Sequence, residues 1–163
     1  MVPLLVASAL AVAPPVTSTG VAHMIATYGP NGAVERLIKP TKRHPMFGDY
    51  EVVLDGISSG KAQWLALAPE LQKGADAGPS EFLKISVAEA LPHNAAGVLR
   101  LGAHGWPIAN ACSYPMLEPR PADTRRYFAK AIPAVAAVRD PTLQSARAIC
   151  LTELRKAQKN AAH

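Results

Sequence analysis

Fifteen prolines interrupt this chain of 163 residues, and they limit the length of any regular element. Proline has no backbone N–H and clashes with the preceding turn, so a helix accepts it in its first turn far better than in its interior. Between the prolines, apolar residues recur at spacings of three and four, which is the period of an amphipathic helix. No segment shows sustained alternation of apolar and polar residues, as a strand would. The sequence therefore predicts several short helices.

About six helices are expected, in one domain over residues 47–163, because the chain length fits a single domain. The first would present Tyr50, Val53, Leu54 and Ile57 on one face. The other apolar faces are Trp64, Leu67, Ala68 and Leu71; Phe82, Leu83, Val87, Ala90 and Leu91; Val98, Leu99 and Leu101; Tyr127, Phe128, Ala131, Val135 and Val138; and Leu143, Ala146, Ile149, Cys150 and Leu154. Such helices predict a compact all-α array of stacked helical hairpins, similar to part of an α-solenoid.

The net charge of +5 raises the question of an anionic partner, such as nucleic acid or a membrane surface. The excess is modest, and we interpret it as spread along the chain over a solvated surface. No nucleic-acid partner is therefore expected. The composition, 49% hydrophobic and 6% aromatic, favours helices packed through small and aliphatic side chains over a β-sandwich.

Residues 1–22 are predicted to be a signal peptide. Leu4 to Ala13 is an uncharged apolar run of the length of a signal-peptide core, too short to span a membrane. Gly20-Val21-Ala22 places small residues where a signal peptidase reads them, so we expect cleavage before His23; cleavage after Ala13 would put a proline beside the scissile bond. The first residues lack Lys and Arg, which leaves open a displaced start or translation from Met24. No transmembrane span is expected after signal removal.

Two cysteines, Cys112 and Cys150, are compatible with one disulfide in an oxidising compartment. The alternative is a pair of unrelated buried thiols, which behave as small apolar groups. There is no CxxC motif and no Cys/His pair at ligand spacing, so neither redox catalysis nor structural zinc is expected. Export and the disulfide together predict a periplasmic or secreted protein.

Residues 23–46 are expected to form an irregular basic arm. Prolines and glycines break every period between residues 27 and 46. The arm contains Arg36, Lys39, Lys42, Arg43 and His44. Few aromatic residues lie between these cations to stack on bases, so we interpret the arm as a solvated leader.

Three parts of the chain resemble small exported helical proteins of unknown function from Gram-negative bacteria. They are the run from Trp64 to Leu101, the position of Cys112, and the segment DPTLQSARAICLTEL that begins at Asp140. The resemblance covers roughly the last two thirds of the chain. It implies a helical fold and an exported location, and it transfers no catalytic, cofactor-binding or metal-binding residue.

One motif has the form of a catalytic signature. Gly56-Ile57-Ser58-Ser59-Gly60 matches G-x-S-x-G, the nucleophile elbow of some hydrolases. That elbow needs a strand before the serine and a helix after it, whereas here the preceding residues have a helical period. A turn between two helices explains the motif without catalysis.

Histidines and carboxylates are scattered. His93 and His104 flank one predicted helix and could approach each other or Glu89, although exposed loop histidines are commoner. Acid/base pairs could come from Asp76, Glu81, Glu89 and Glu118, but sequence gives no separation between them. Glu81 is expected in the first turn of its helix as a dipole partner. An amino-terminal His23 could chelate copper if cleavage exposed it.

Trp106 lies on the long loop that Cys112 would anchor. An aromatic residue there could be a recognition anchor or a plug that seals the core, and the plug is preferred. The sequence thus favours a non-catalytic interaction or structural module whose partner is a protein or a cell-envelope component, with no cofactor. A small periplasmic enzyme and a metal-handling protein using His23 remain as alternatives.

Overall fold

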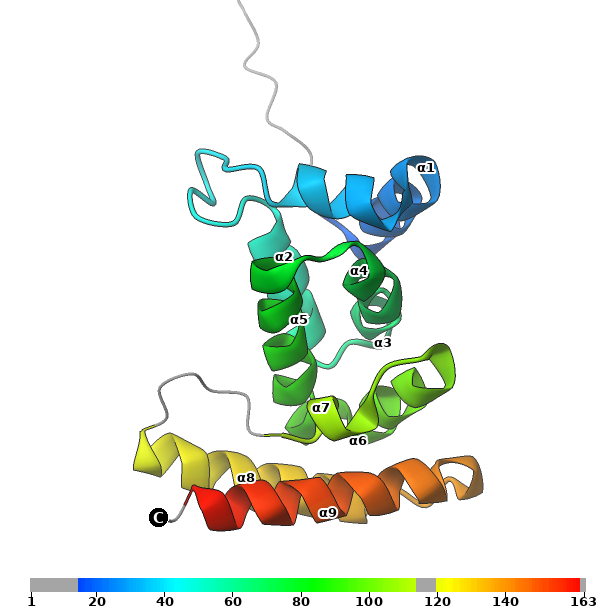
Figure 1. The fold of residues 1–163 in the computed structure, drawn as a ribbon, viewed down its shortest axis with the longest axis vertical. Helices are drawn as coiled ribbons and strands as arrows, with labels where there is room; N and C mark the ends of the chain where they lie inside the picture. The colour runs from blue at the N-terminus through cyan, green and yellow to red at the C-terminus, as the bar shows by residue number, and fades with distance from the viewer. Residues whose placement is uncertain (1–14, 114–119, 162–163) are drawn as a thin grey trace, which may run out of the picture.

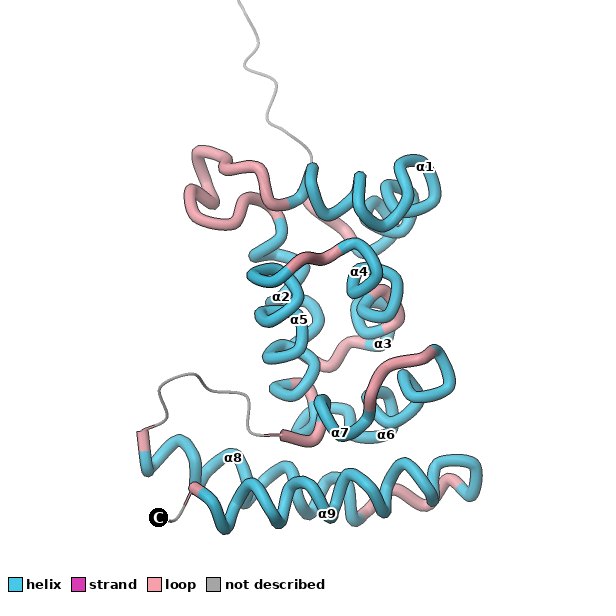
Figure 2. Tube along the Cα trace, in the orientation of Figure 1, coloured by secondary structure: helices cyan, strands magenta, loops and turns pink. Residues whose placement is uncertain are grey.

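The three- and four-residue spacing is realised as helices throughout the computed structural model, which describes residues 15–113 and 120–161. In these residues there are nine α-helices, two short 3-10 helices and no strand (Figures 1 and 2). The elements are α1 (Ser18–Leu37), α2 (Tyr50–Ser58), α3 (Ala62–Leu65), α4 (Ala68–Gly74), α5 (Ala77–Glu89), α6 (Leu91–Arg100), η1 (Leu101–His104), α7 (Ile108–Ala111), α8 (Pro121–Ala136), η2 (Pro141–Leu143) and α9 (Gln144–Asn160). The all-α expectation is confirmed, with more helices than the six expected.

The helices form three tiers (Figure 1). Helix α1 crosses one end of the molecule, α2 to α7 fill the middle, and α8 and α9 run antiparallel across the other end. Among neighbouring helices, α8 and α9 form a hairpin, as the sequence suggests. Two other closely packed pairs, α1 with α4 and α2 with α5, join helices that are not consecutive. The rest of the fold is therefore not the regular stack of helical hairpins that the sequence predicts.

Most residues of the predicted apolar faces are buried, but Ile149 of the last face is 47% exposed. Tyr50, Val53 and Ile57 of α2 are completely buried, and Leu54 packs against them from a half-buried position. The Tyr50 hydroxyl donates a hydrogen bond to the Pro79 carbonyl over 3.2 Å, so the buried phenol is satisfied, and burial raises its pKa. The α2 stripe thus fixes α5 beside it.

Three helix boundaries fall at residues suited to begin or cap a helix. Pro69 lies in the first turn of α4 and separates it from α3. Asn94 breaks the helical backbone inside α6 and accepts a hydrogen bond from the Gly97 amide over 2.9 Å, so it caps the second half of that helix. Asp140 caps η2 by accepting from the Thr142 amide over 3.0 Å.

The structure corrects the expectation of an irregular arm before residue 47. Helix α1 covers Ser18 to Leu37, with a break at Gly29, where the backbone has a φ of +70°, and only the stretch after Ile38 is irregular. Pro30 follows the break, so it begins a new helical run and does not interrupt one. Gly74 of α4 packs with its backbone directly against Pro30, an approach that leaves no room for a Cβ.

Two further boundaries differ from the predictions. The loop that Cys112 anchors contains the short helix α7, and α5 begins at Ala77, too early for Glu81 to lie in its first turn. Glu81 therefore falls in the second turn of α5, where it pairs with Lys84 at 3.3 Å, and it is not a first-turn dipole partner.

The predicted disulfide is present. Cys112 and Cys150 are both buried, their sulfur atoms are 2.02 Å apart, and the bond joins the end of α7 to the middle of α9. Since α8 lies between them in the chain, the bond ties the terminal hairpin to the central tier.

Candidate functional site

A polar pocket of about 390 Å³ lies where the end of α2, the junction of α5 with α6, and the first half of α8 meet. Its lining residues are Ser58, Glu89, Pro92, His93, Arg120, Asp123, Arg126, Tyr127 and Lys130. Two of them are Glu89 and His93, whose approach the sequence left as a possibility beside an exposed loop histidine, and both line this pocket. His104 instead lines a separate pocket of about 280 Å³ between α3 and α6, so the two histidines are apart.

Glu89 supplies the polar pocket with a half-buried carboxyl. Burial raises the pKa of its carboxyl, and the nearby Asp55 carboxylate raises it further. The neighbouring Tyr127 hydroxyl donates to the Ala88 carbonyl over 3.1 Å, which holds the aromatic ring against the end of α5. A half-buried carboxyl in a pocket is typical of functional sites, although ion-pair networks also produce such shifts.

The G-x-S-x-G motif is explained by packing. Ser58 donates its hydroxyl to the Asp55 carbonyl of its own helix over 3.1 Å. Gly56 lies under the Trp64 ring, and Gly60 ends α2 with a φ of +74°. Among the described residues no hydrogen bond joins Ser58 to His93. The segment before the serine is helix α2, so the strand that a nucleophile elbow requires is not there.

The remaining candidate carboxylates do not converge. Asp76 precedes α5, Glu81 is paired with Lys84, and Glu118 lies outside the described residues. Asp123 lines the polar pocket with Glu89, but it is held between Arg120 at 2.6 Å and Arg126 at 3.3 Å. A free pair of carboxylates of the kind used by glycosidases is therefore not assembled from these residues.

Trp106 is only 3% exposed, so its ring faces the core. Its indole Nε1 has no hydrogen-bond partner among the described residues. A buried ring with an unpartnered N–H seals the space under the loop and offers no surface to a partner. This position favours the plug interpretation over the recognition anchor.

No set of three or more His, Cys, Asp or Glu side chains in residues 15–113 and 120–161 is grouped closely enough to hold a metal ion. His23 is exposed on α1, and its imidazole lies 3.5 Å from the Thr27 hydroxyl. Within the same residues no helix is both long and apolar enough to cross a bilayer.

The strongest feature of the surface is electrostatic. Residues 120–163 contain nine Lys and Arg against three Asp and Glu, a formal charge of +6, whereas residues 1–119 sum to −1. The expectation that the basic excess is spread along the chain is therefore wrong. Nearly all of it belongs to the α8–α9 hairpin, which covers one end of the molecule.

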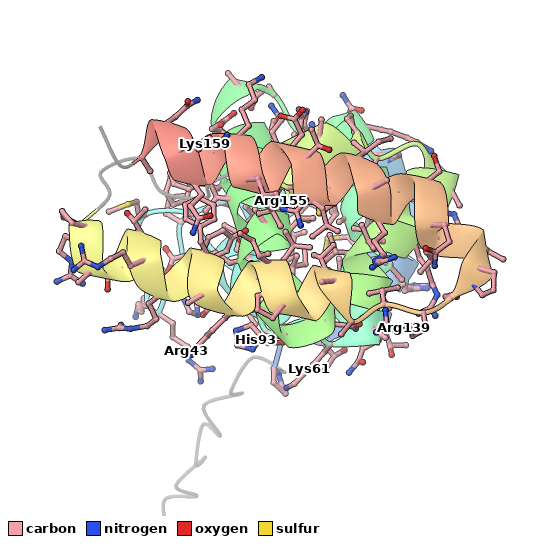
Figure 3. The ribbon with its side chains drawn as sticks, turned by 90° about the horizontal axis from the view of Figure 1, so that it is seen from below. Arg43, Lys61, His93, Arg139, Arg155 and Lys159 are labelled. Atoms are coloured by element: carbon pink, nitrogen blue, oxygen red, sulfur yellow. A yellow bond between two sulfur atoms is a disulfide. The ribbon has the colours of Figure 1, made fainter. Side chains whose placement is uncertain are left out.

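Many of these cations have no charged partner. Arg125, Lys130, Arg155 and Lys159 are exposed and make no ion pair within the described residues. Arg139, at the turn of the hairpin, donates to the Ala136 carbonyl over 3.2 Å and likewise makes no ion pair in the described part of the chain. We call these five residues the basic face. Figure 3, drawn from the α8–α9 side, shows Arg155 and Lys159 with α9 and Arg139 at the turn.

Other cations seen in the same view lie farther from the hairpin. Arg43 and Lys61 come from the segment before α2 and from the α2–α3 connection, which belong to other levels of the molecule (Figures 1 and 3). His93, at the start of α6, lies along the α8 edge and joins the basic face to the polar pocket.

The signal for the basic face is present in the sequence as a count of charge by segment. The net charge of the whole chain does not reveal this segregation, because the residues between 47 and 119 carry an excess of acids. What sequence alone does not supply is the exposure of the cations, which depends on which faces of α8 and α9 are buried.

No protein-family model, no curated protein and no solved structure matches this chain.

Proposed function

We propose that this protein is a non-catalytic interaction module of the periplasm, and that it binds an anionic component of the cell envelope through the basic face. The observation that carries the proposal is the segregation of charge, which gives the hairpin a formal charge of +6. Opposite charges steer partners together and orient them on approach, so a concentrated patch does more for binding than the same charge dispersed.

The hairpin is built as a fixed support for these cations. Its core side is held by Phe128, Ala131 and Val135 of α8 and by Leu154 of α9, all buried. Arg147 of α9 donates to the Ala136 carbonyl of α8 over 3.1 Å, which joins the two helices near their turn. The disulfide anchors α9 from the other side. Binding would therefore require little reordering of the backbone, and the entropy lost on association is correspondingly small.

Export is part of the proposal and rests on the disulfide and on the apolar amino-terminal run. The contacts at the start of α1 bear on the position of the signal-peptide cleavage site. The Thr17 hydroxyl accepts from the Gly20 amide over 3.1 Å and caps α1, and Val21 is 1% exposed in the core. Cleavage before His23 would remove both, whereas cleavage after Ala13 would keep them.

Intact mass of the protein from the native envelope tests export and the cleavage site together. Recovery in the periplasmic fraction, with thiols blocked until reduction, supports the proposal. Recovery from the cytoplasm with two free thiols contradicts it.

A second candidate function, a small hydrolase-like periplasmic enzyme, is favoured by one observation, the raised pKa of Glu89 inside the polar pocket. A carboxyl with a raised pKa, in a pocket that His93 also lines, could serve as a general acid. The geometry assembles no hydrogen-bonded nucleophile and base from the described residues, so binding is the better-supported proposal. The metal-handling alternative depends on a free amine at His23, which the same intact-mass measurement tests.

Retention on immobilised heparin, a soluble polyanion, tests the binding proposal. The double variant Arg155→Glu with Lys159→Glu reverses two charges of the basic face. Lys39→Glu with Lys42→Glu changes the net charge by the same amount, at exposed positions beyond α1 on the far side of the molecule. The hairpin variant should elute at clearly lower salt than the control variant, because screening and charge removal act on the same contacts. Equal elution of the two variants would contradict the proposal.

A further inference from the structure

The outer side of the α8–α9 hairpin combines small side chains with long cationic ones. Small exposed side chains are spread along its length, namely Ala122 and Ala129 on α8, Ala137 just after α8, and Ser145, Ala148 and Thr152 on α9. Arg155 and Lys159 of the basic face are exposed on long flexible stems, which can reach beyond these short side chains, whereas Lys130 also lines the polar pocket. The hairpin can therefore approach a flat surface closely while its cations reach that surface first.

The outer side of the hairpin has the dimensions of a broad platform. Helix α8 has 16 residues and α9 has 17, so each runs for about 25 Å at 1.5 Å per residue. Two antiparallel helices, each about 10 Å across with side chains, make a platform about 20 Å wide. Such a platform suits a planar partner.

Nucleic acid fits this platform less well. The major groove of B-DNA is about 12 Å wide and admits one helix, so a helix pair lying side by side cannot enter it. Single-stranded nucleic acid is held by aromatic rings on which bases stack. The exposed large hydrophobic residues of the described chain are Tyr28, Met46 and Ile149, and only Ile149, which is not aromatic, belongs to the hairpin.

We infer, building on the proposed function, that the partner of the basic face is an anionic phospholipid bilayer, on which α8 and α9 lie parallel to the surface. Exposed cations near an anionic leaflet are attracted to its phosphates within about a Debye length. The hairpin lacks a broad exposed apolar stripe, so the protein docks on the headgroups through charge and does not insert deeply.

Co-sedimentation with vesicles tests the inference. The parent protein, the Arg155→Glu/Lys159→Glu variant and the Lys39→Glu/Lys42→Glu control are mixed with vesicles of phosphatidylglycerol and phosphatidylcholine, or of phosphatidylcholine alone. The parent and the control should sediment with the anionic vesicles at low salt and remain in solution at high salt. The hairpin variant should bind them at least about tenfold more weakly, as expected for reversing two surface cations. Equal binding of all three proteins would overturn the assignment of the basic face.

The orientation of the hairpin is tested by fluorescence. Trp64 and Trp106 are buried, so an added surface tryptophan reports on its own environment. Thr152→Trp on the outer side of α9 should shift its emission to the blue with anionic vesicles, whereas Ala26→Trp on α1, also exposed, should not. Blue shifts of equal size at both positions would contradict the predicted orientation. Circular dichroism and melting of each variant establish that it is folded.

Binding to heparin and to double-stranded DNA separates the two proposals. Retention on either polyanion without binding to anionic vesicles would overturn the lipid inference and leave the proposed function standing. Absence of binding to vesicles, heparin and DNA would overturn both.

Discussion

The Trp64 ring lies so close to the Cα of Gly56 that a Cβ added there would be 2.5 Å from the nearest ring atom. Glycine at this position lets α2 and α3 pack across a tight turn, and Trp64 is buried by that contact. This relationship explains the first residue of the G-x-S-x-G motif by sterics. We therefore expect substitutions of Gly56 and of Ser58 to change the stability of the protein by different amounts.

Gly56→Ala should destabilise the protein by about 1–3 kcal/mol, because the new methyl group must displace a buried indole ring. Ser58→Ala should change stability by no more than about 0.5 kcal/mol, since it loses one hydrogen bond at a partly exposed position. Urea denaturation of the two variants and the parent provides the comparison. A neutral Gly56→Ala variant would show that the ring moves aside freely.

Removing the disulfide should cost on the order of 4 kcal/mol, the chain-entropy value for a separation of 38 residues. Cys112→Ser should therefore melt well below the parent in oxidising buffer. Adding reductant should bring the parent close to the variant and leave the variant unchanged. Equal melting of both proteins before reduction would mean that the cross-link contributes nothing to stability.

Trp106→Ala should destabilise by about 3–5 kcal/mol, the usual range for emptying a buried aromatic site. Trp106→Phe should cost less, because it keeps most of the ring volume and eliminates an indole N–H that has no partner in the described structure. Thermal melts of the two variants test the plug interpretation. A Trp106→Ala variant as stable as the parent would instead point to an exposed role.

Glu89→Gln should make the protein slightly more stable at neutral pH. Folding raises the pKa of this carboxyl through burial and through Asp55, so the folded state favours the protonated form. The stabilisation associated with that proton is present below the ordinary pKa of glutamate and is lost as the pH rises through the raised value. We expect a gain below about 1 kcal/mol, because the side chain is half exposed and solvent screens it.

The difference in melting temperature between Glu89→Gln and the parent should grow from pH 4 to pH 7. The melting temperature of the variant is compared with that of the parent at each pH because other carboxylates change the stability of both proteins in the opposite direction. The pKa values of Glu51 and Asp140 are lowered, by a hydrogen bond from the Phe47 amide and by hydrogen bonds from Thr142, respectively. Their contributions are lost as the pH falls. A constant difference across the range would contradict the assignment to Glu89.

The helices that periodicity identified are the ones that bury a single apolar face. The stripe of α2 and the face of α8 could be predicted because each runs for more than two turns, and because Gly60 follows α2 and Pro121 begins α8. The caps Asn94 and Asp140 are predictable for the same reason, since a short polar side chain beside an apolar run favours the start of a helix.

Helix α1 was missed because Gly29 and Pro30 stand in its middle. Adjacent glycine and proline indicate a loop when read alone, but here they form the junction of two helical runs. What favours this arrangement is the packing of α4 against Pro30, a long-range contact that sequence order does not reveal. Helix α7 was missed for a simpler reason, since four residues are too few to show a period.

Individual residues of the candidate site could be predicted from the sequence, but their assembly into one pocket could not. The sequence offered an approach of His93 to His104 or to Glu89, because the two histidines flank one predicted helix. Asp123 and Lys130 reach the pocket of Glu89 and His93 from α8, 34 and 41 residues after Glu89 in the chain. The basic face depends on the same kind of information, because the burial of Phe128 and Leu154 decides which side of each helix meets solvent.

The Cys112–Cys150 bond has one more consequence, for how the protein survives damage. Together with the backbone it closes a covalent ring that includes all of α8 and the start of α9. A protease that cuts one peptide bond inside this ring opens it but releases no fragment, because the two halves stay joined through sulfur. The nicked protein would keep its mass, apart from one added water, until it is reduced. In an oxidising compartment that contains proteases, the cations of α8 would thus remain attached to those of α9 after a cut that would separate them in a chain without the bond.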